Sequence, residues 1–188
     1  HSSEATNAAI TQANFYLNDS GGQYHNGTTD ATRTLSFGRL SAEHRQHYTA
    51  VLKGFLSMLM LQFPGGTQGH QIDAFARRSL WDLGLDFDHG TGHGVGHQLL
   101  IHEQPQRIAK KVNPWPLVAG NIMTVEPGYY RTGHYGIRIE NQVEVVESRP
   151  GFCRFRSLTL VPIDLRQVEG SLLSDQEKQL LTDYHPLV

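Results

Sequence analysis

The sequence predicts an α+β fold made of two successive blocks of antiparallel strands and helices. Two turn signals, Asn26-Gly27 and the run at 131–136, each lie between segments of strand character. Two stretches, 41–63 and 67–83, repeat apolar residues at helical spacing. No linker separates the blocks, and 188 residues suit one domain that buries about 70% of the unfolded chain's surface. We therefore expect a single domain over 1–188 with an internal duplication, although the halves share too little sequence to show a repeat.

The first block begins with two or three antiparallel strands between residues 14 and 37. Phe15-Tyr16-Leu17 has strand character, and Asn26-Gly27 is a strong hairpin signal. Ser41 is a typical helix N-cap, and Pro64-Gly65-Gly66 ends the helix that it opens. The apolar positions of this helix are Val51, Leu52, Phe55, Leu59 and Phe63.

The second block starts with a helix over 67–83, followed by an irregular segment that contains three prolines. A hairpin is expected from 121 to 146, with its turn at 131–136. Ser174 and Glu177 form a capping box for a last helix at about 175–185. The buried face of the helix over 67–83 is predicted to be Ile72, Phe75, Ala76 and Leu80.

Composition argues against several classes of partner. A formal charge of -2, from 16 basic and 18 acidic side chains, gives no net attraction for nucleic acid or an anionic membrane. The longest apolar run, near residues 55–63, is far shorter than the roughly 20 residues of a membrane span. Cys153 is the single cysteine, so a structural thiol in a reducing compartment is expected. These features predict a cytoplasmic protein that binds neither nucleic acid nor membrane.

Two pairs of carboxylates are the feature most indicative of function. Asp19 and Asp30 flank the first turn, and Glu126 and Glu140 flank the second, with Arg138 on the face of Glu140. Four converging carboxylates without counter-charge would raise one another's pKa and destabilise the fold. Two divalent cations would cancel their charge.

A stretch rich in histidine and glycine, HGTGHGVGH at 89–97, lies between the two pairs. Its glycines fit neither common nucleotide-binding pattern, and no glutamate follows His89 as a zinc-protease helix requires. Spacing alone leaves open whether His89 or His93 binds metal. Carboxylates with one imidazole favour manganese, cobalt or iron over a cysteine-rich structural zinc site.

Three strings in order resemble aminopeptidase P, the Xaa-Pro aminopeptidase of the pita-bread metallopeptidase family. They are DSGGQYHNGTTDATRT at 19–34, HGTGHGVGHQLLIHE at 89–103 and TVEPGYYRTGHYGIRIENQVEV at 124–145. The resemblance extends from about residue 14 to 163. It implies the pita-bread fold, in which two related αβ halves surround a curved antiparallel sheet.

The resemblance also implies roles for individual residues and a homodimer for the full-length protein. Five side chains would hold two divalent ions. The expected metal is manganese, with cobalt, zinc or iron as alternatives. Asp30 and Glu140 would each bind both ions. His89 and His102 would line the substrate site, and Arg138 would support the ligand shell. The metal ligands implied are Asp19, Asp30, His93, Glu126 and Glu140.

The function implied is release of the N-terminal residue from peptides that have proline in the second position. Glu126 would take a proton from a water held by the two metals and later return it to the prolyl nitrogen. A prolidase acting on Xaa-Pro dipeptides is the nearest alternative, and methionine aminopeptidase has different motif strings. A pita-bread protein that has lost catalysis and serves as an interaction module is a third possibility, although such proteins typically lack several ligands.

The sequence departs from the family pattern at two places. Residues 7–10 are followed almost at once by the first metal strand, and Gln12 stands nearest to the place of a substrate-binding histidine. We expect that residues are missing near 10–14 rather than that a loop was deleted. Gln104 occupies a position where glycine is common. The resemblance implies a C-terminal fragment of a longer protein, because the upstream domain of full-length members and the start of the catalytic domain are missing here.

Overall fold

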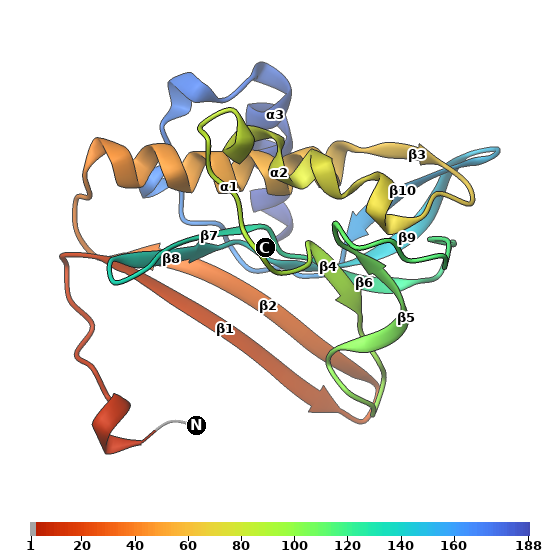
Figure 1. Cartoon of the computed structure of the whole chain (residues 1–188), viewed down its shortest axis with the longest axis horizontal. Helices are drawn as coiled ribbons and strands as arrows, with labels where there is room; N and C mark the ends of the chain where they lie inside the picture. Colours follow the sequence, from red (N-terminus) through yellow and green to blue (C-terminus); the bar gives the residue numbers. More distant parts are fainter. Residues whose placement is uncertain (1–2) are drawn as a thin grey trace.

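The computed structural model describes residues 3–188, in which helices cover one face of curled antiparallel sheets (Figure 1). Every strand pairing in this range is antiparallel, which confirms the α+β class. The helices are α1 (Ala42–Met60), α2 (Asp73–Trp81) and α3 (Asp175–Tyr184), with short 3-10 turns at Glu4–Thr6, Gly69–Gln71, Leu165–Gln167, Gly170–Leu172 and His185–Leu187. The strands are β1 (Phe15–Tyr24), β2 (Gly27–Ser36), β3 (Gln62–Pro64), β4 (Gly92–Gly94), β5 (Glu103–Ile108), β6 (Ile122–Val125), β7 (Gly128–Arg131), β8 (Tyr135–Arg138), β9 (Asn141–Arg149) and β10 (Phe152–Ser157).

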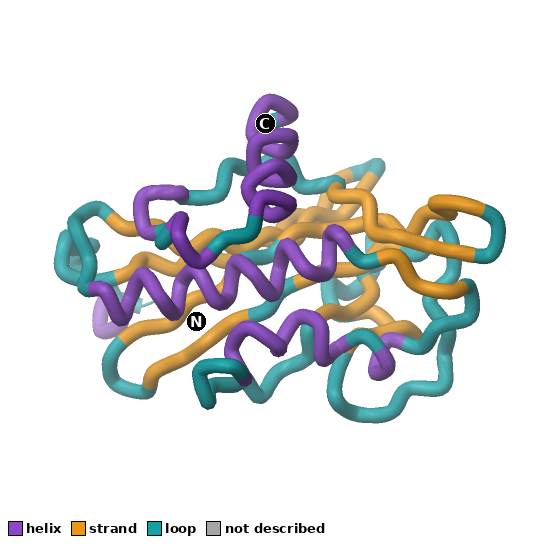
Figure 2. Tube along the Cα trace, turned by 90° about the horizontal axis from the view of Figure 1, so that it is seen from above, coloured by secondary structure: helices purple, strands orange, loops and turns teal. Residues whose placement is uncertain are grey.

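The strands of the two blocks meet side by side near the middle of the molecule. The larger sheet has the order β3-β10-β9-β6-β4-β5, whereas β1-β2 and β7-β8 form separate pairs. The N–H of Glu140 donates to the carbonyl of Thr32 at 3.1 Å, so β2 lies against the chain between β8 and β9. Figure 2 shows α1 and α2 side by side over the strands. Residues about 110 positions apart in the sequence are thereby brought together.

Helix α1 begins as predicted and ends earlier. The Ser41 hydroxyl accepts a hydrogen bond from the N–H of His44, which caps the first turn. The helix stops at Met60, and Phe63 is instead buried in β3, where it pairs with Cys153 of β10. The assignment of Phe63 to the helix was therefore wrong. Because a buried strand residue is apolar as well, the helical spacing continued into the strand by coincidence.

Helix α2 is shorter than the predicted 67–83. It covers Asp73–Trp81, and a 3-10 turn at Gly69–Gln71 precedes it. Ile72, Ala76 and Leu80 are buried as predicted, but Phe75 is 45% exposed, so its assignment to the core was wrong. The buried face instead follows Asp73 and Arg77, and residue 75 lies about 200° around the helix from each of them.

The second hairpin is confirmed, but it is bent into two parts. Strands β7 and β8 pair around the turn at 132–134, and the outer legs β6 and β9 pair within the larger sheet. Pro127 lies at the bend between β6 and β7. The capping box of Ser174 and Glu177 is also present at the start of α3. Strands β3, β4, β5 and β10 were not predicted, since β4 is Gly-His-Gly and β5 contains Pro105, which are residues typical of loops.

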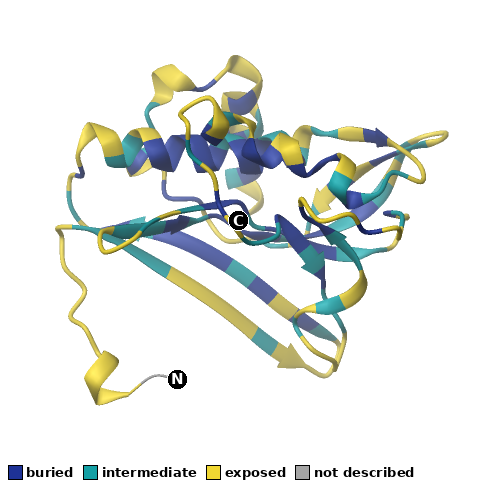
Figure 3. Ribbon diagram, in the orientation of Figure 1, coloured by how far each residue is buried: buried dark blue, intermediate teal, exposed yellow. Residues whose placement is uncertain are grey.

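One buried apolar cluster includes residues from Tyr48 in α1 to Tyr184 at the end of α3. Figure 3 shows this buried zone along α1 and across the middle of the strands, whereas β1 is exposed over much of its length. Cys153 belongs to the cluster as a buried free thiol, consistent with the expected structural thiol. In the part of the chain that the structure describes, no helix combines the length and apolar character needed to cross a membrane.

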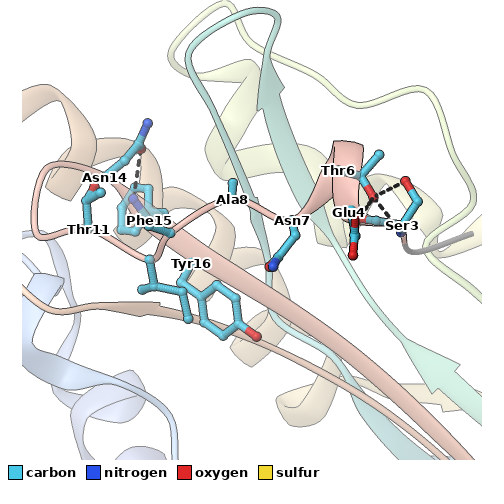
Figure 4. Close-up of a pocket in the computed structure, with 11 residues that line it drawn as sticks. Ser3, Glu4, Thr6, Asn7, Ala8, Thr11, Asn14, Phe15 and Tyr16 are labelled. Atoms are coloured by element: carbon cyan, nitrogen blue, oxygen red, sulfur yellow. Dashed lines mark hydrogen bonds between the residues drawn. The ribbon is translucent and has the colours of Figure 1, made fainter.

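The residues before β1 form an exposed arm. A hollow of about 680 Å³ lies between the arm and the start of β1 (Figure 4). No predicted ligand or catalytic residue lines this hollow. The exposed Gln12 packs its backbone against Gly38, where a Cβ would come within 2.4 Å of the Gln12 carbonyl oxygen. Neither the arm nor Gln12 contributes to the predicted metal centre.

The closest approach of α1 and α2 gives a test of the fold. A Cβ at Gly54 would lie 2.1 Å from the carbonyl oxygen of Ala76, so Gly54→Ala must push the helices apart. We expect this change to lower the free energy of unfolding by about 1–3 kcal/mol, measured by urea denaturation. Gly170→Ala, whose Cβ would meet nothing within 4 Å, is the control and should change stability by less than about 0.5 kcal/mol. Equal stability of the two variants would contradict the observed helix packing.

Candidate metal centre

Four of the five predicted ligands lie together where β2, β4, β6 and the start of β9 meet. Asp30, His93 and Glu140 each offer one ligand atom, and these atoms lie within 4.8 Å of one another. Nε2 of His93 lies 3.4 Å from Oδ2 of Asp30 and 3.3 Å from Oε1 of Glu126. Asp30 and Glu140 are buried. The predicted convergence of these distant residues is therefore present.

Asp19 lies apart from this group. It is opposite Thr32 in the pairing of β1 with β2, and its side chain is 46% exposed. Its Oδ2 accepts a hydrogen bond of 2.5 Å from Nη2 of Arg138. The Nε of Arg138 also lies 3.9 Å from Oε2 of Glu126. Arg138 thus connects Asp19 to the four clustered side chains.

The His93 side chain provides a direct test of whether a cation fits the site. Its Nδ1 donates to the carbonyl of Gly94 at 2.8 Å, which leaves Nε2 directed towards the carboxylates. Nε2 is buried and has no hydrogen-bond partner in residues 3–188. Burial disfavours the imidazolium, yet the Asp30 and Glu126 carboxylates outweigh burial and raise the pKa of His93. An imidazole nitrogen and carboxylate oxygens that face one another at this range need a cation between them, which is a proton without metal and can be a metal ion instead.

The carboxylates show the same need for positive charge. Burial raises the pKa of Glu140, and the neighbouring Glu126 and Asp30 raise it further, to about 8. Burial likewise raises the pKa of Glu126, although His93 and Arg138 oppose this effect. Both acids would therefore hold protons at pH values where glutamate is normally ionised. Divalent ions would stabilise the ionised forms instead, so these side chains fit a metal centre.

Contacts between strands β4 and β6 set the positions of His93 and Glu126. The N–H of His93 donates to the Thr124 hydroxyl, which in turn donates to Oε1 of Glu126, each at 3.1 Å. Strands β4 and β6 approach so closely that a Cβ on Gly92 would lie 2.0 Å from the Thr124 carbonyl oxygen. The glycine beside His93 is therefore required by the packing of the two strands.

His89 belongs to a hydrogen-bonded chain on one side of the centre. Its Nδ1 donates to the carbonyl of Gly90, so Nε2 accepts from the Tyr130 hydroxyl, with each distance 2.8 Å. Tyr130 in turn accepts from Nη1 of Arg138 at 2.8 Å. Burial is the main cause that lowers the pKa of His89, and the positive charges of Arg138 and Arg77 add to it. His89 is therefore a neutral imidazole at neutral pH, and Tyr130 is a site residue that the sequence patterns did not identify.

A pocket of about 280 Å³ adjoins the cluster. The predicted residues His89 and His102 both line it, and the rings of His102 and His93 lie 4.3 Å apart between centroids. Glu126 faces the same pocket. The six side chains that line it are His89, His93, His102, Gln104, Arg107 and Glu126. A substrate in this pocket would contact the candidate centre directly.

A buried ion pair on α2 supports the histidine segment from behind. Arg77 binds both oxygens of Asp73, at 2.6 and 3.2 Å, and is completely buried. Its guanidinium also donates to the carbonyls of Phe87 and His89, at 2.5 and 2.9 Å. Oδ1 of Asp73 accepts from the Thr91 hydroxyl at 2.7 Å.

The same support extends to Glu126. The carbonyl of Thr91 accepts a hydrogen bond of 2.7 Å from the N–H of Glu126. Asp73 and Arg77 therefore hold the backbone of both His89 and Glu126. The sequence patterns did not identify Arg77, although residues 73, 76, 77 and 80 have the spacing of one helix face and are all buried.

Comparison with known sequences identifies relatives. The sequence model of metallopeptidase family M24 matches residues 1–147, and that of the C-terminal region of peptidase M24 matches residues 151–188. A probable Xaa-Pro aminopeptidase P from Laccaria bicolor is 47% identical over 187 residues, covering 95% of this chain and 29% of that protein. Xaa-Pro aminopeptidase 2 from Sus scrofa is 42% identical over 183 residues, covering 95% of this chain and 27% of that protein.

Solved structures show the same fold. X-prolyl aminopeptidase from Caenorhabditis elegans, described as a cytosolic enzyme with a dinuclear active site, has a TM-score of 0.89 and 45% identity. The match covers 92% of this chain and 29% of that one, and it confirms the predicted pita-bread fold. Prolidase from Pyrococcus furiosus has a TM-score of 0.68 and 31% identity, covering 77% of this chain and 41% of that one. The chain thus spans less than a third of the length of the three aminopeptidases named here.

The raised pKa of Glu140 predicts a pH dependence of stability without metal. Between its ordinary pKa of 4.5 and about 8, the folded state binds a proton that the unfolded state has lost. The contribution of Glu140 to folding therefore becomes less favourable as the pH rises through this range. In EDTA, Glu140→Gln should gain stability relative to the unchanged chain between pH 5 and pH 8, measured by urea denaturation. A stability difference that does not vary with pH would argue against the carboxylate cluster.

The Thr91 hydroxyl allows a test of the support from α2. Thr91→Val removes the donor to Asp73 with little change of shape, and we expect it to cost about 1–3 kcal/mol of stability. Amide hydrogen exchange at Glu126 should become faster, because its hydrogen-bond acceptor is no longer held. Thr91→Ser keeps the hydroxyl and serves as the matched control. Unchanged exchange at Glu126 in Thr91→Val would show that the contact does not position this residue.

Proposed function

The chain belongs to metallopeptidase family M24, and we propose that it releases the N-terminal residue from peptides with proline in the second position. The buried Nε2 of His93, directed at Asp30 and Glu126 without a hydrogen-bond partner, is the observation that carries the metal-dependent chemistry. The aminopeptidase relatives support the choice of an exopeptidase and of Xaa-Pro peptides. Residues 1–188 would act as one catalytic domain.

The proposed centre holds two divalent ions, with manganese as the proposed metal and cobalt, zinc or iron as alternatives. Asp30 and Glu140 would be shared ligands, and Asp19, His93 and Glu126 would complete the set. Oδ1 of Asp19 remains available for this role, because the hydrogen bond from Arg138 uses Oδ2. When bound, the ions would polarise the scissile carbonyl and supply a hydroxide nucleophile at neutral pH.

The protein's own side chains would handle protons and charge. Glu126 faces the pocket, and burial raises its pKa, so its carboxylate can accept a proton and later return it to the prolyl nitrogen. His89 and His102 both line this pocket and would place the peptide. Tyr130 and Arg138 hold His89 in one tautomer and orientation. Because an Xaa-Pro bond is a tertiary amide without an N–H, the substrate must be positioned by such contacts elsewhere.

A prolidase would use the same centre but would cleave dipeptides only. The prolidase structure compared above is less similar to the chain than the X-prolyl aminopeptidase, so the aminopeptidase is preferred. An interaction module without catalysis is disfavoured by the presence of all five ligand side chains. Relative rates on Ala-Pro and Ala-Pro-Ala separate the two peptidases.

We further propose a cytoplasmic enzyme whose partners are peptides rather than nucleic acid or membrane, and which forms a homodimer at full length. The Caenorhabditis elegans relative is described as cytosolic. The formal charge of -2 offers no general attraction for phosphate.

The role of Glu126 is tested by Glu126→Gln. This change keeps the size of the side chain but removes the base, so kcat on Ala-Pro-Ala should fall by about 10²- to 10⁴-fold in the manganese-loaded chain. Circular dichroism should show the same fold. Glu147→Gln, at an exposed position of β9, is the control and should retain full activity. Retained turnover in Glu126→Gln would refute the assignment.

A further inference from the structure

Arg107 places a positive charge on the wall of the pocket next to the candidate centre. It lies in β5 directly opposite His93 of β4. Residues opposite each other in an antiparallel pair project from the same face, and both side chains line the pocket with Glu126. Nη2 of Arg107 lies 3.8 Å from the position that a Cβ on Gly90 would occupy. The guanidinium is thus beside the His89 segment.

The protein does not neutralise this charge. Arg107 is half-buried, yet within residues 3–188 its guanidinium takes part in neither an ion pair nor a side-chain hydrogen bond. Three other arginines near the site differ. Arg77 is held by Asp73 and Arg138 by Asp19, and Arg33 donates to the carbonyl of Glu140 and to Oδ1 of Asn141. A guanidinium presents a planar fork of donors that matches a carboxylate. Arg107 therefore presents to the pocket a half-buried guanidinium without a protein partner among the described residues.

Gln104 lines the same wall from the start of β5. Its side-chain amide has no hydrogen bond in the described part of the chain, and it adds an uncharged N–H donor to the guanidinium of Arg107. The carboxylate of Glu126 does not take up these donors, because it is engaged by Thr124 and lies near His93 and Arg138. The wall therefore offers donors for an anionic group that the substrate must bring.

We propose that Arg107, assisted by Gln104, selects substrates that carry a carboxylate close to the scissile bond. This inference rests on the proposed function for the position of that bond. The carboxylate can have two sources: the free C-terminus of an Xaa-Pro dipeptide, or an acidic side chain on the residue after proline. Both present the same planar group to the guanidinium.

Two matched peptide pairs distinguish these sources. Ala-Pro and Ala-Pro-amide differ in the terminal carboxylate, and Ala-Pro-Glu-amide and Ala-Pro-Gln-amide differ in the side-chain carboxylate. In the manganese-loaded chain at low ionic strength, we expect kcat/KM to favour the charged member of one pair by about tenfold. Arg107→Gln should reduce this ratio to about one, whereas Arg107→Lys should retain part of it. Lys111→Gln makes the same change in net charge at an exposed position outside the pocket and should leave the ratio unchanged.

Calorimetric binding of the same peptides keeps this inference separate from the proposed function. If the chain cleaves none of the peptides but binds a charged member more tightly, and Arg107→Gln loses that preference, the anion site stands and the peptidase proposal fails. If neither rates nor affinities distinguish the members of either pair, or if Arg107→Gln keeps the preference, the anion site is overturned.

Discussion

The structure depends on the need for positive charge where three acidic side chains surround one histidine. Asp30, Glu126 and Glu140 come close to Nε2 of His93 in a largely buried site, where ionised carboxylates are unfavourable without a cation. In the metal-free chain protons meet this need, as the raised pKa values of Glu140 and His93 indicate. Metal ions would replace these protons, and the fold would then become more stable as the centre forms.

The rest of the fold places these groups accurately from distant parts of the chain. The contact between Glu140 and Thr32 joins the two blocks of strands, and Gly92 lets β4 approach β6. Behind the site, Asp73 and Arg77 on α2 fix the backbone of the histidine segment. Removing one partner of this buried pair would leave an uncompensated charge behind the histidine segment. His93 and Glu126 line the pocket, whereas Asp73 and Arg77 do not.

Local patterns predicted much of this fold and some of its site. The Asn26-Gly27 turn, the Ser41 cap and the capping box at Ser174 depend on neighbours in sequence, so they could be identified directly. Strands β4 and β5 could not be identified from the sequence, because Gly-His-Gly and Pro105 acquire strand geometry only from the strands that pair with them. The predictions for Phe75 and Phe63 were wrong for a related reason, because the spacing of apolar residues does not show which element will cover each of them. Tyr130 and Arg107 belong to the site because of contacts with residues distant in sequence. The spacing of residues along the chain does not reveal such contacts.

The central claim is that the clustered side chains bind a pair of metal ions, and anomalous diffraction from a crystal soaked in manganese tests it most directly. The account predicts two anomalous peaks about 3.5–4 Å apart, with oxygens of Asp30 and Glu140 at roughly 2.0–2.3 Å. Nε2 of His93 should coordinate one of the two ions. A fully soaked crystal without peaks at this site, or with peaks only at other surface carboxylates, would contradict the account.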